Sequence, residues 1–364
     1  MKRTVTYCAG KPGVRRQFRR ECGKISFCMN TSSDINIEKP KIIQALLAGF
    51  NTIANKPYLI ILPILLDLFL WFGPGWRVDN VFKPVIDSLQ TFPGLDTTEY
   101  ANIIGDLQIS WQELLANFNL AVILRTFPIG VPSLMASKTP FINPLGHTTV
   151  TFLNTDGQVL WLTLLFLALG ITLGNLYMQK ISQQVMQNDQ KTNIKTFLKS
   201  LIQAILMPVA LCIILLLICI PVLFILGLVM MISPAISQFL TSLALLVIIW
   251  VLLPLIFTPH GIFLYKQNLI AAMMTSISVV RMSMAKTAWF ILASYVIVEG
   301  LDYLWRSPGT DNWFLLVGIL GHAFIVSAII AASFHYFIDA TKFSQTVMNK
   351  QLQANQASSL NDQD

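Results

Sequence analysis

Residues 201–232 read LIQAILMPVALCIILLLICIPVLFILGLVMMI, and this stretch contains no charged side chain. A bilayer core about 30 Å thick needs about 20 apolar residues of helix to cross it. The stretch therefore predicts a membrane-spanning helix. Five further apolar runs lie between Lys39 and Phe343, and they are Tyr58–Phe72, Val159–Met178, Ile236–Phe257, Ala285–Leu304 and Trp313–Phe337.

These runs predict an all-α fold, a polytopic integral membrane protein with six transmembrane helices. The composition agrees, because 54% of the 364 residues are hydrophobic and 12% are charged, with a mean hydropathy of +0.63. Such values are typical of membrane proteins. The first run has only fifteen residues. The mainly apolar segment Ile42–Ala54 before it is expected either to add length or to lie along the membrane surface.

The formal charge is concentrated at the amino terminus. Residues 1–28 hold eight Lys and Arg against one Glu, whereas the rest of the chain has equal numbers of basic and acidic side chains. The segment lacks the apolar core of a secretory signal. We interpret it as sequence upstream of a true start at Met29, and the alternatives are a disordered basic arm on anionic lipid or an RNA-binding tail. For the neutral body of the protein we expect no nucleic-acid partner.

The distribution of Lys and Arg predicts the orientation. If the amino terminus is cytoplasmic, six crossings leave only five basic residues outside, namely Arg77, Lys83, Arg125, Lys138 and Arg306. The positive-inside rule therefore favours a plasma (inner) membrane protein with both termini in the cytoplasm. A crossing at Phe118–Met135 would reverse this bias. Its Pro128, Gly130 and Pro132 break helices, so we expect this segment to be interfacial or re-entrant and packed on the bundle.

Lysine-led amphipathic stretches precede the first, third and fifth crossings. Each crossing is followed by a return helix, which is the pattern of three repeats of surface helix plus transmembrane hairpin. The plainer alternative is that odd-numbered crossings tend to have such lead-ins. The expected divisions are a basic segment at 1–28, a lead-in and first helix at 29–73, an extracytoplasmic insert at 74–157, a helix bundle at 158–343 and a polar cytoplasmic tail at 344–364.

The insert at 74–157 is the largest expected extramembrane portion. Its first half has helix-like patterns at 80–91 and 97–118, and its second half is rich in turn residues and predicts a short hairpin. We expect a small helical cap. A protein partner is expected to bind either this insert or the cytoplasmic amphipathic helices.

Three ionisable residues lie at depth within the apolar runs, away from the ends of each run, and all are in the half expected to face outward. They are Asp67, Glu299 and His322. A charge in the hydrocarbon region is unfavourable unless it is paired or faces the bundle interior. One hypothesis is that the three converge on an outward-opening polar pocket that carries protons or binds a cation. The alternative is that Glu299 and Asp302 reach the outer interface while Asp67 or His322 only hydrogen-bonds a neighbouring helix.

Other motifs predict packing rather than chemistry. Gly170 and Gly174 form a GxxxG pattern with Asn175 beside it, and this face is expected to pack on another helix. His335 and Asp339 share a helical face, and His260 is the nearest further ligand, but two histidines and one carboxylate without a fixed spacing do not predict a zinc site. The sequence contains no Walker A loop, HExxH, GxSxG or CxxC pattern. We therefore expect no metal and no cofactor.

The amphipathic lead-ins, the segment LIAAMMTSISVVRMSMAKTAWFILASYV and the terminal SFHYFIDATKF carry a resemblance over residues 40–345. In pattern the chain resembles six-helix bacterial membrane proteins, including the membrane-domain family associated with glycerophosphodiester phosphodiesterases. The resemblance implies no catalytic residue, and the chain lacks a phosphodiesterase domain. We expect an accessory, scaffolding or permease-like subunit. The alternatives are a proton- or cation-coupled transporter and an intramembrane lipid-modifying enzyme.

Overall fold

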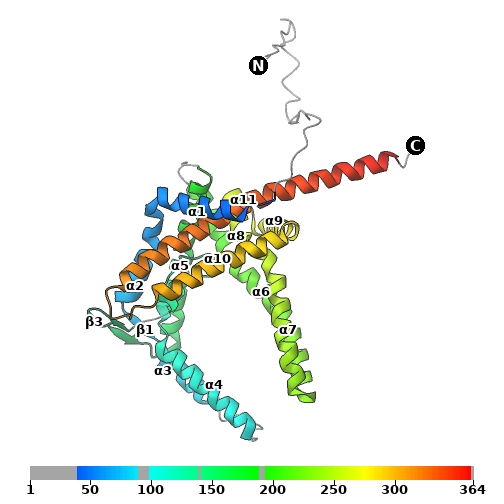
Figure 1. Cartoon of the computed structure of the whole chain (residues 1–364). Helices are drawn as coiled ribbons and strands as arrows, with labels where there is room; N and C mark the ends of the chain where they lie inside the picture. The colour runs from blue at the N-terminus through cyan, green and yellow to red at the C-terminus, as the bar shows by residue number, and fades with distance from the viewer. Residues whose placement is uncertain (1–38, 89–97, 138–140, 188–192, 362–364) are drawn as a thin grey trace. The chain divides into compact units, whose positions relative to one another are not determined.

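The computed structural model describes residues 39–88, 98–137, 141–187 and 193–361, and this part of the chain is mostly helical (Figure 1). Within it, five helices are long and apolar enough to cross a membrane. They are Asp156–Val185, Ile194–Ile232, Ala235–Tyr265, Met284–Trp305 and Leu315–Gln353. A sixth span is present if the bent pair Ile42–Asn55 and Pro57–Phe72 is counted as one crossing. The helices agree with the expected all-α class and are compatible with a membrane-embedded protein.

The first expected crossing is sharply bent. Helix α1 (Ile42–Asn55) is followed by η1 (Pro57–Ile60) and α2 (Ile61–Phe72), and the angle across the break is 93°. A residue before proline is disfavoured in the α conformation, and Lys56 has φ −135° and ψ 64°. The Lys56–Pro57 pair therefore separates α1 from the apolar run that follows it.

The lead-in segments differ among the three expected repeats. Helix α9 (Leu269–Met282) is separated from α10 (Met284–Trp305) by Ser283, much as α1 is separated from α2. Helix α6 (Ile194–Ile232) is instead continuous, although it contains Pro208 and Pro221. The separate amphipathic helix expected before the third crossing is therefore not found. From Ile194 to Ile232 the described backbone stays helical, without a break like the one at Lys56.

Helix α11 (Leu315–Asn361) is the central element of the fold. Side-chain hydrogen bonds join it to α1, α5 (Asp156–Val185), α8 (Thr258–Tyr265) and α10. They include one pair with each of these helices, namely Thr52 with His335, Tyr177 with Ser327, His260 with Ser333 and Thr287 with Tyr336, at 2.7–3.1 Å. Side-chain hydrogen bonds of this kind hold membrane helices together where apolar burial cannot, because lipid is as apolar as the protein interior.

Helix α1 lies along α11 at a glycine contact. A Cβ atom added at Gly49 would lie 2.4 Å from the carbonyl oxygen of Ala328 and 2.5 Å from the amide nitrogen of Ala332. Both atoms belong to the backbone, so they cannot move aside like the end of a flexible side chain. Only glycine at this position permits the close approach.

We expect Gly49→Ala to lower the free energy of unfolding by about 1–3 kcal/mol, the usual effect of overpacking. Gly227→Ala is the matched control, because a Cβ there meets nothing within 4 Å and alanine is the better helix former. Thermal unfolding of the purified protein in detergent compares the two variants. Equal melting temperatures would contradict the close packing of α1 on α11.

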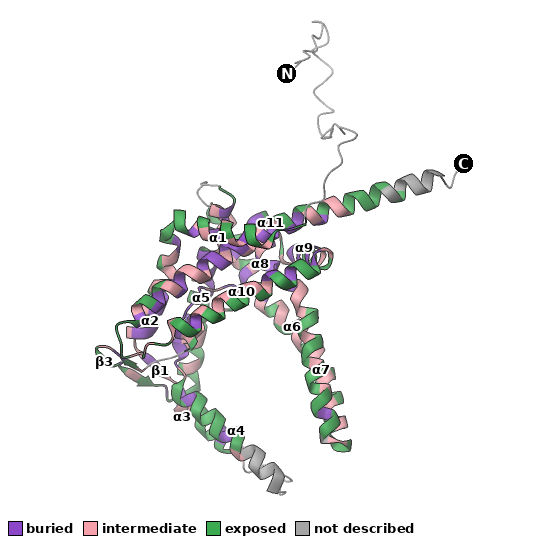
Figure 2. Cartoon of the chain, viewed as in Figure 1, coloured by how far each residue is buried: buried purple, intermediate pink, exposed green. Residues whose placement is uncertain are grey.

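The hairpin of α6 and α7 (Pro234–Leu252) is much less buried than α11. Half of the most apolar window of α11 is buried, compared with none of the window in α6 (Figure 2). Ser233 alone joins the two helices, and the Ser237 hydroxyl donates to the carbonyl oxygen of Leu226 across the hairpin. Large apolar side chains on every side of a helix suit lipid chains.

In its described residues the insert contains two α-helices, two short 3-10 helices and two small sheets. Strand β1 (Gly75–Arg77) pairs in parallel with β4 (Val150–Phe152), and β2 (Ile142–Asn143) pairs in antiparallel with β3 (Gly146–His147) to form the short hairpin that the sequence predicts. Helices α3 (Asp79–Ser88) and α4 (Thr98–Asn117) occupy the two segments with helix-like patterns. Residues 89–97, between them, lie outside the described part.

The segment at 118–137 packs into the helical part of the protein. It forms η3 (Leu120–Leu124) and η4 (Met135–Ser137), joined by irregular backbone, rather than a long helix. Most of its apolar side chains are buried in the same core as those of α2 and α5, whereas Phe127 is exposed. The prediction that this segment does not form a crossing helix, but packs on the bundle, agrees with this arrangement.

Candidate functional site

Asp67 is a fully buried carboxylate on α2, and it binds the segment 133–135. The Ser133 hydroxyl donates to Oδ1 at 2.5 Å, and the backbone amides of Met135 and Leu134 donate to Oδ1 at 2.9 Å and Oδ2 at 3.1 Å. The Ser133 oxygen in turn accepts from the amide of Ala136 at 3.0 Å. A carboxylate with three donors satisfies polar backbone that would otherwise lie unpaired in the apolar interior.

This arrangement makes Asp67 an anchor. Its two oxygens hold the start of η4 against α2, and the neighbouring Leu134 and Met135 side chains are also fully buried. The carboxylate is therefore engaged with the protein's own backbone. Binding of a cation or proton at Asp67 would compete with these three hydrogen bonds.

His322 forms a second buried polar group with Asp302 and Arg306. Its Nδ1 atom lies 2.6 Å from Oδ1 of Asp302, and the Arg306 guanidinium donates to Oδ2 of Asp302 at 3.1 Å. Asp302 and His322 are each 3% exposed. The Nε2 atom of His322 is buried and has no hydrogen-bond partner among the described residues. His322 is also close enough to Asp67 for an electrostatic interaction.

The structure thus brings Asp67 and His322 into one neighbourhood but does not include Glu299. That side chain is exposed on α10, whereas Asp302, one turn further along the same helix, is buried against His322. Asp302 is the site residue that the sequence argument assigned to the interface. A usable signal was present, because Asp302 and Arg306 have the i, i+4 spacing of a helical ion pair.

The GxxxG face of α5 packs on the short 3-10 helix η3 and the loop after it, and not on one of the long helices. A Cβ added at Gly170 would lie 2.6 Å from the carbonyl oxygen of Leu124, and one at Gly174 would lie 2.6 Å from Cα of Gly130. The glycines therefore do permit close approach, but of η3 and the loop after it. Asn175 is fully buried, and its side-chain atoms have no hydrogen-bond partner among the described residues.

The histidines considered for zinc are engaged elsewhere. His335 pairs with Thr52 and His260 with Ser333, while Asp339 faces Lys342 at 3.9 Å. No group of three His, Cys, Asp or Glu side chains in the described residues could hold a metal ion.

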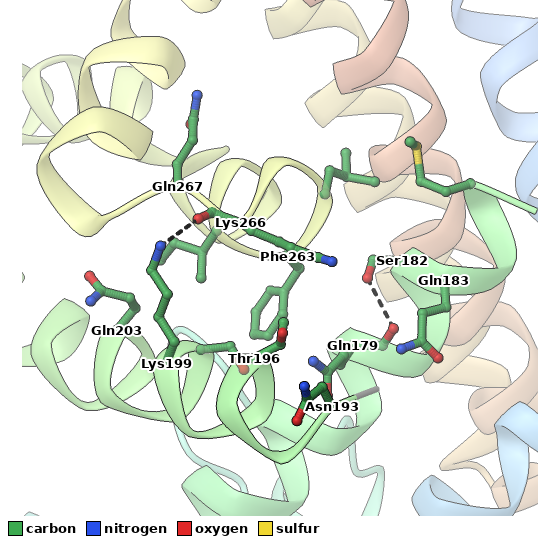
Figure 3. Close-up of a pocket in the computed structure, with 14 residues that line it drawn as sticks. Gln179, Ser182, Gln183, Asn193, Thr196, Lys199, Gln203, Phe263, Lys266 and Gln267 are labelled. Carbon is green, nitrogen blue, oxygen red and sulfur yellow. Dashed lines mark hydrogen bonds between the residues drawn. The ribbon is translucent and has the colours of Figure 1, made fainter. Parts of the chain in front are cut away.

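A polar cavity that the sequence argument missed lies between the end of α5, the start of α6 and the end of α8 (Figure 3). Its volume is about 190 Å³. Most of the lining side chains are amides, hydroxyls and ammonium groups, and they are Gln179, Ser182, Gln183, Asn193, Thr196, Lys199, Ser200, Gln203, Lys266 and Gln267. The end of α5 and the start of α6 are near each other in sequence, but the end of α8 is far from both, so no local motif marked the site.

Within the cavity, Lys199 and Gln179 have different surroundings. The Lys199 ammonium donates to the carbonyl oxygen of Lys266 at 3.1 Å, which leaves two of its three N–H bonds for other acceptors. Lys266 closes α8 in the left-handed conformation, with φ 53°. Gln179 is 8% exposed, and its amide makes no hydrogen bond with another described side chain.

No family model matches the chain, and neither a curated protein nor a solved structure is significantly similar to it. The resemblance to the membrane domains associated with glycerophosphodiester phosphodiesterases therefore stays a prediction. What the residues can do must be argued from the geometry alone.

Proposed function

We propose that the protein is an accessory or scaffolding subunit of the plasma membrane, with six crossings, both termini in the cytoplasm and a protein partner bound outside. The apolar helices and the distribution of Lys and Arg support the topology. The subunit role is supported by one observation above all, the apolar surface of the insert helices.

Helices α3 and α4, which we call the arm, expose large apolar side chains outside the expected membrane spans. Ile86 and Leu115 are buried, and the amide of Gln108 donates to the carbonyl oxygen of Ile86 to join the helices. Five other apolar side chains of the arm are exposed, namely Phe82, Val85, Ile109, Trp111 and Leu114. An extramembrane helix pair with this much exposed apolar surface is typical of an interaction site.

The charge of the arm favours a protein partner over the membrane surface. Residues 79–117 contain six acidic side chains and one basic side chain, Lys83. Anionic lipid would repel such a segment, because attraction to it comes from Lys and Arg. The matching surface is an apolar patch with basic side chains at its edge, since complementary potentials steer association.

The lead-in helices α1 and α9 are weaker candidates for the surface that binds the partner. Ile53 and Gly49 of α1 pack against the rest of the bundle, and Ala272 and Val279 of α9 are buried as well. The protein's own residues thus already cover part of each lead-in surface. This favours the insert over the lead-in helices as the surface that binds the partner.

We expect Trp111→Ala to weaken partner binding by about tenfold or more, because buried aromatic residues dominate interface energies. The test is quantitative recovery of the same partner with the tagged protein from native membranes, together with cross-linking from arm positions. Leu145→Ala is the matched control, since Leu145 is exposed in the insert but lies in the β2–β3 turn. Recovery of this chain alone, or equal recovery with Trp111→Ala, would contradict the proposal.

The transporter alternative has less support. It needs ionisable groups that face a space open to solute, and three cavities among the described residues are lined by none of Asp67, Glu299 and His322. Asp67 is engaged by three donors, and Glu299 is exposed. The unpartnered Nε2 atom of His322 is the one feature that favours proton handling.

A further inference from the structure

The cavity between α5, α6 and α8 has the chemistry of an anion site. Among its fourteen lining residues two are lysines and none is acidic. Amides and hydroxyls supply further N–H and O–H donors. Lys199 and Lys266 are exposed, so their ammonium groups are accessible to an anion from outside the protein.

The position of the cavity in the chain favours a ligand at the membrane surface. Asn193 caps the first turn of α6, where its side-chain oxygen accepts from the amide of Lys195 at 3.3 Å. The most apolar part of α6 begins about two turns later. Basic pockets at the lysine-rich ends of transmembrane helices are suited to the phosphate groups of lipids.

The surface beside the cavity is apolar. Ile202, Ile205, Leu206 and Val209 follow the lining residues along α6, and all four are exposed. Ile262, Phe263 and Leu264 of α8 form an apolar wall of the cavity itself. The phosphate of a lipid matches the polar cavity, and its acyl chains match the apolar surface beside the cavity. Free phosphate matches only the polar cavity.

We propose that this cavity binds the phosphate of an anionic phospholipid, with the acyl chains lying along the exposed face of α6. The cavity volume of about 190 Å³ is large enough to hold several water molecules or a phosphate group. Lys199 and Lys266 supply the charge, and the amide of Gln179 supplies a buried donor. The site does not depend on the accessory role proposed above, since it needs no protein partner.

The test is lipid retention by the full chain. Delipidated protein is titrated with phosphatidylglycerol or phosphatidylcholine in mixed micelles, and bound lipid is counted by native mass spectrometry. We expect preferential binding of phosphatidylglycerol, and Lys199→Gln and Lys266→Gln should each weaken it about fivefold, as the loss of about 1 kcal/mol per lysine implies. Lys195→Gln is the matched control, because Lys195 is exposed on the same helix but does not line the cavity.

Two control experiments complete the test. One asks whether the bound phosphate belongs to a lipid or to a soluble molecule, and the other asks whether the substitutions disturb the fold. Inorganic phosphate and glycerol 3-phosphate are added as competitors, and we expect neither to displace the lipid at millimolar concentration. Displacement by either would show a site for soluble phosphate and overturn the lipid assignment. The melting temperature of each delipidated variant should match that of the unaltered protein. Equal lipid binding by Lys199→Gln and Lys195→Gln, or no preference between the two lipids, would also overturn the proposal.

Discussion

Asp67→Ala is expected to lower the free energy of unfolding by about 3–5 kcal/mol. This is the usual cost of removing a buried charged side chain from the groups that bind it. The substitution leaves the Ser133 hydroxyl and the amides of Leu134 and Met135 without their acceptor. Each unsatisfied buried donor costs about 1–3 kcal/mol. We expect a large fall in the melting temperature in detergent and release of η4 from α2.

Two further variants give this prediction its controls. Asp67→Asn keeps one carbonyl oxygen but places an NH₂ group near an amide donor. We therefore expect its free energy of unfolding to lie between those of Asp67→Ala and the unaltered protein. Glu299→Gln changes an exposed carboxylate on α10, and its effect should stay within about 0.5 kcal/mol. If Asp67→Ala unfolds at the same temperature as the unaltered protein, the carboxylate does not anchor the segment 133–135.

Release of the segment can be measured separately from stability. A cysteine introduced at Ala136, beside the Asp67 contacts, should react slowly with a soluble maleimide in the unaltered protein. Asp67→Ala should raise the labelling rate, whereas Glu299→Gln should not. This readout distinguishes local loss of the anchor from a general loss of packing.

The anchor shows which part of the site the sequence could predict. Burial of an aspartate in an apolar run implies that it has polar partners, because hydrocarbon leaves it no other way to be satisfied. The identity of those partners was beyond local patterns. They lie 66–68 residues away in a segment whose proline and glycine content indicates only that it is not a helix.

Local sequence patterns also could not identify what packs on the glycine face of α5. Small residues at Gly170 and Gly174 do indicate that another backbone approaches closely, and the structure agrees. The partner is the loop after η3, and irregular backbone has no periodicity that would mark it as a packing surface. Periodicity predicted the long apolar helices because each of them is a property of one continuous segment.

The polar cavity was missed for a related reason. Its lining residues come from the last turns of α5, the first turns of α6 and the end of α8. Each of these segments is an ordinary polar helix end when considered alone. Only the packing of α8 against α5 and α6 turns three such ends into one basic site.

Asp302→Ala is expected to destabilise the protein by about 3–5 kcal/mol, because it removes the carboxylate of a buried ion pair. His322 would lose its contact at Nδ1, and Arg306 would lose its hydrogen bond to Oδ2. His322→Ala should have a smaller effect, about 1–3 kcal/mol, because Asp302 keeps the guanidinium as a partner. Thermal unfolding in detergent measures both variants.

The double variant Asp302→Ala/His322→Ala tests whether the two side chains act together. We expect it to be less destabilised than the sum of the single variants, by about 0.5–3 kcal/mol, as contacting residues usually show. Asp339→Ala is the matched control, because Asp339 pairs with Lys342 at the surface and such pairs contribute about 1 kcal/mol at most. Strict additivity would mean that the 2.6 Å contact between His322 and Asp302 does not stabilise the fold.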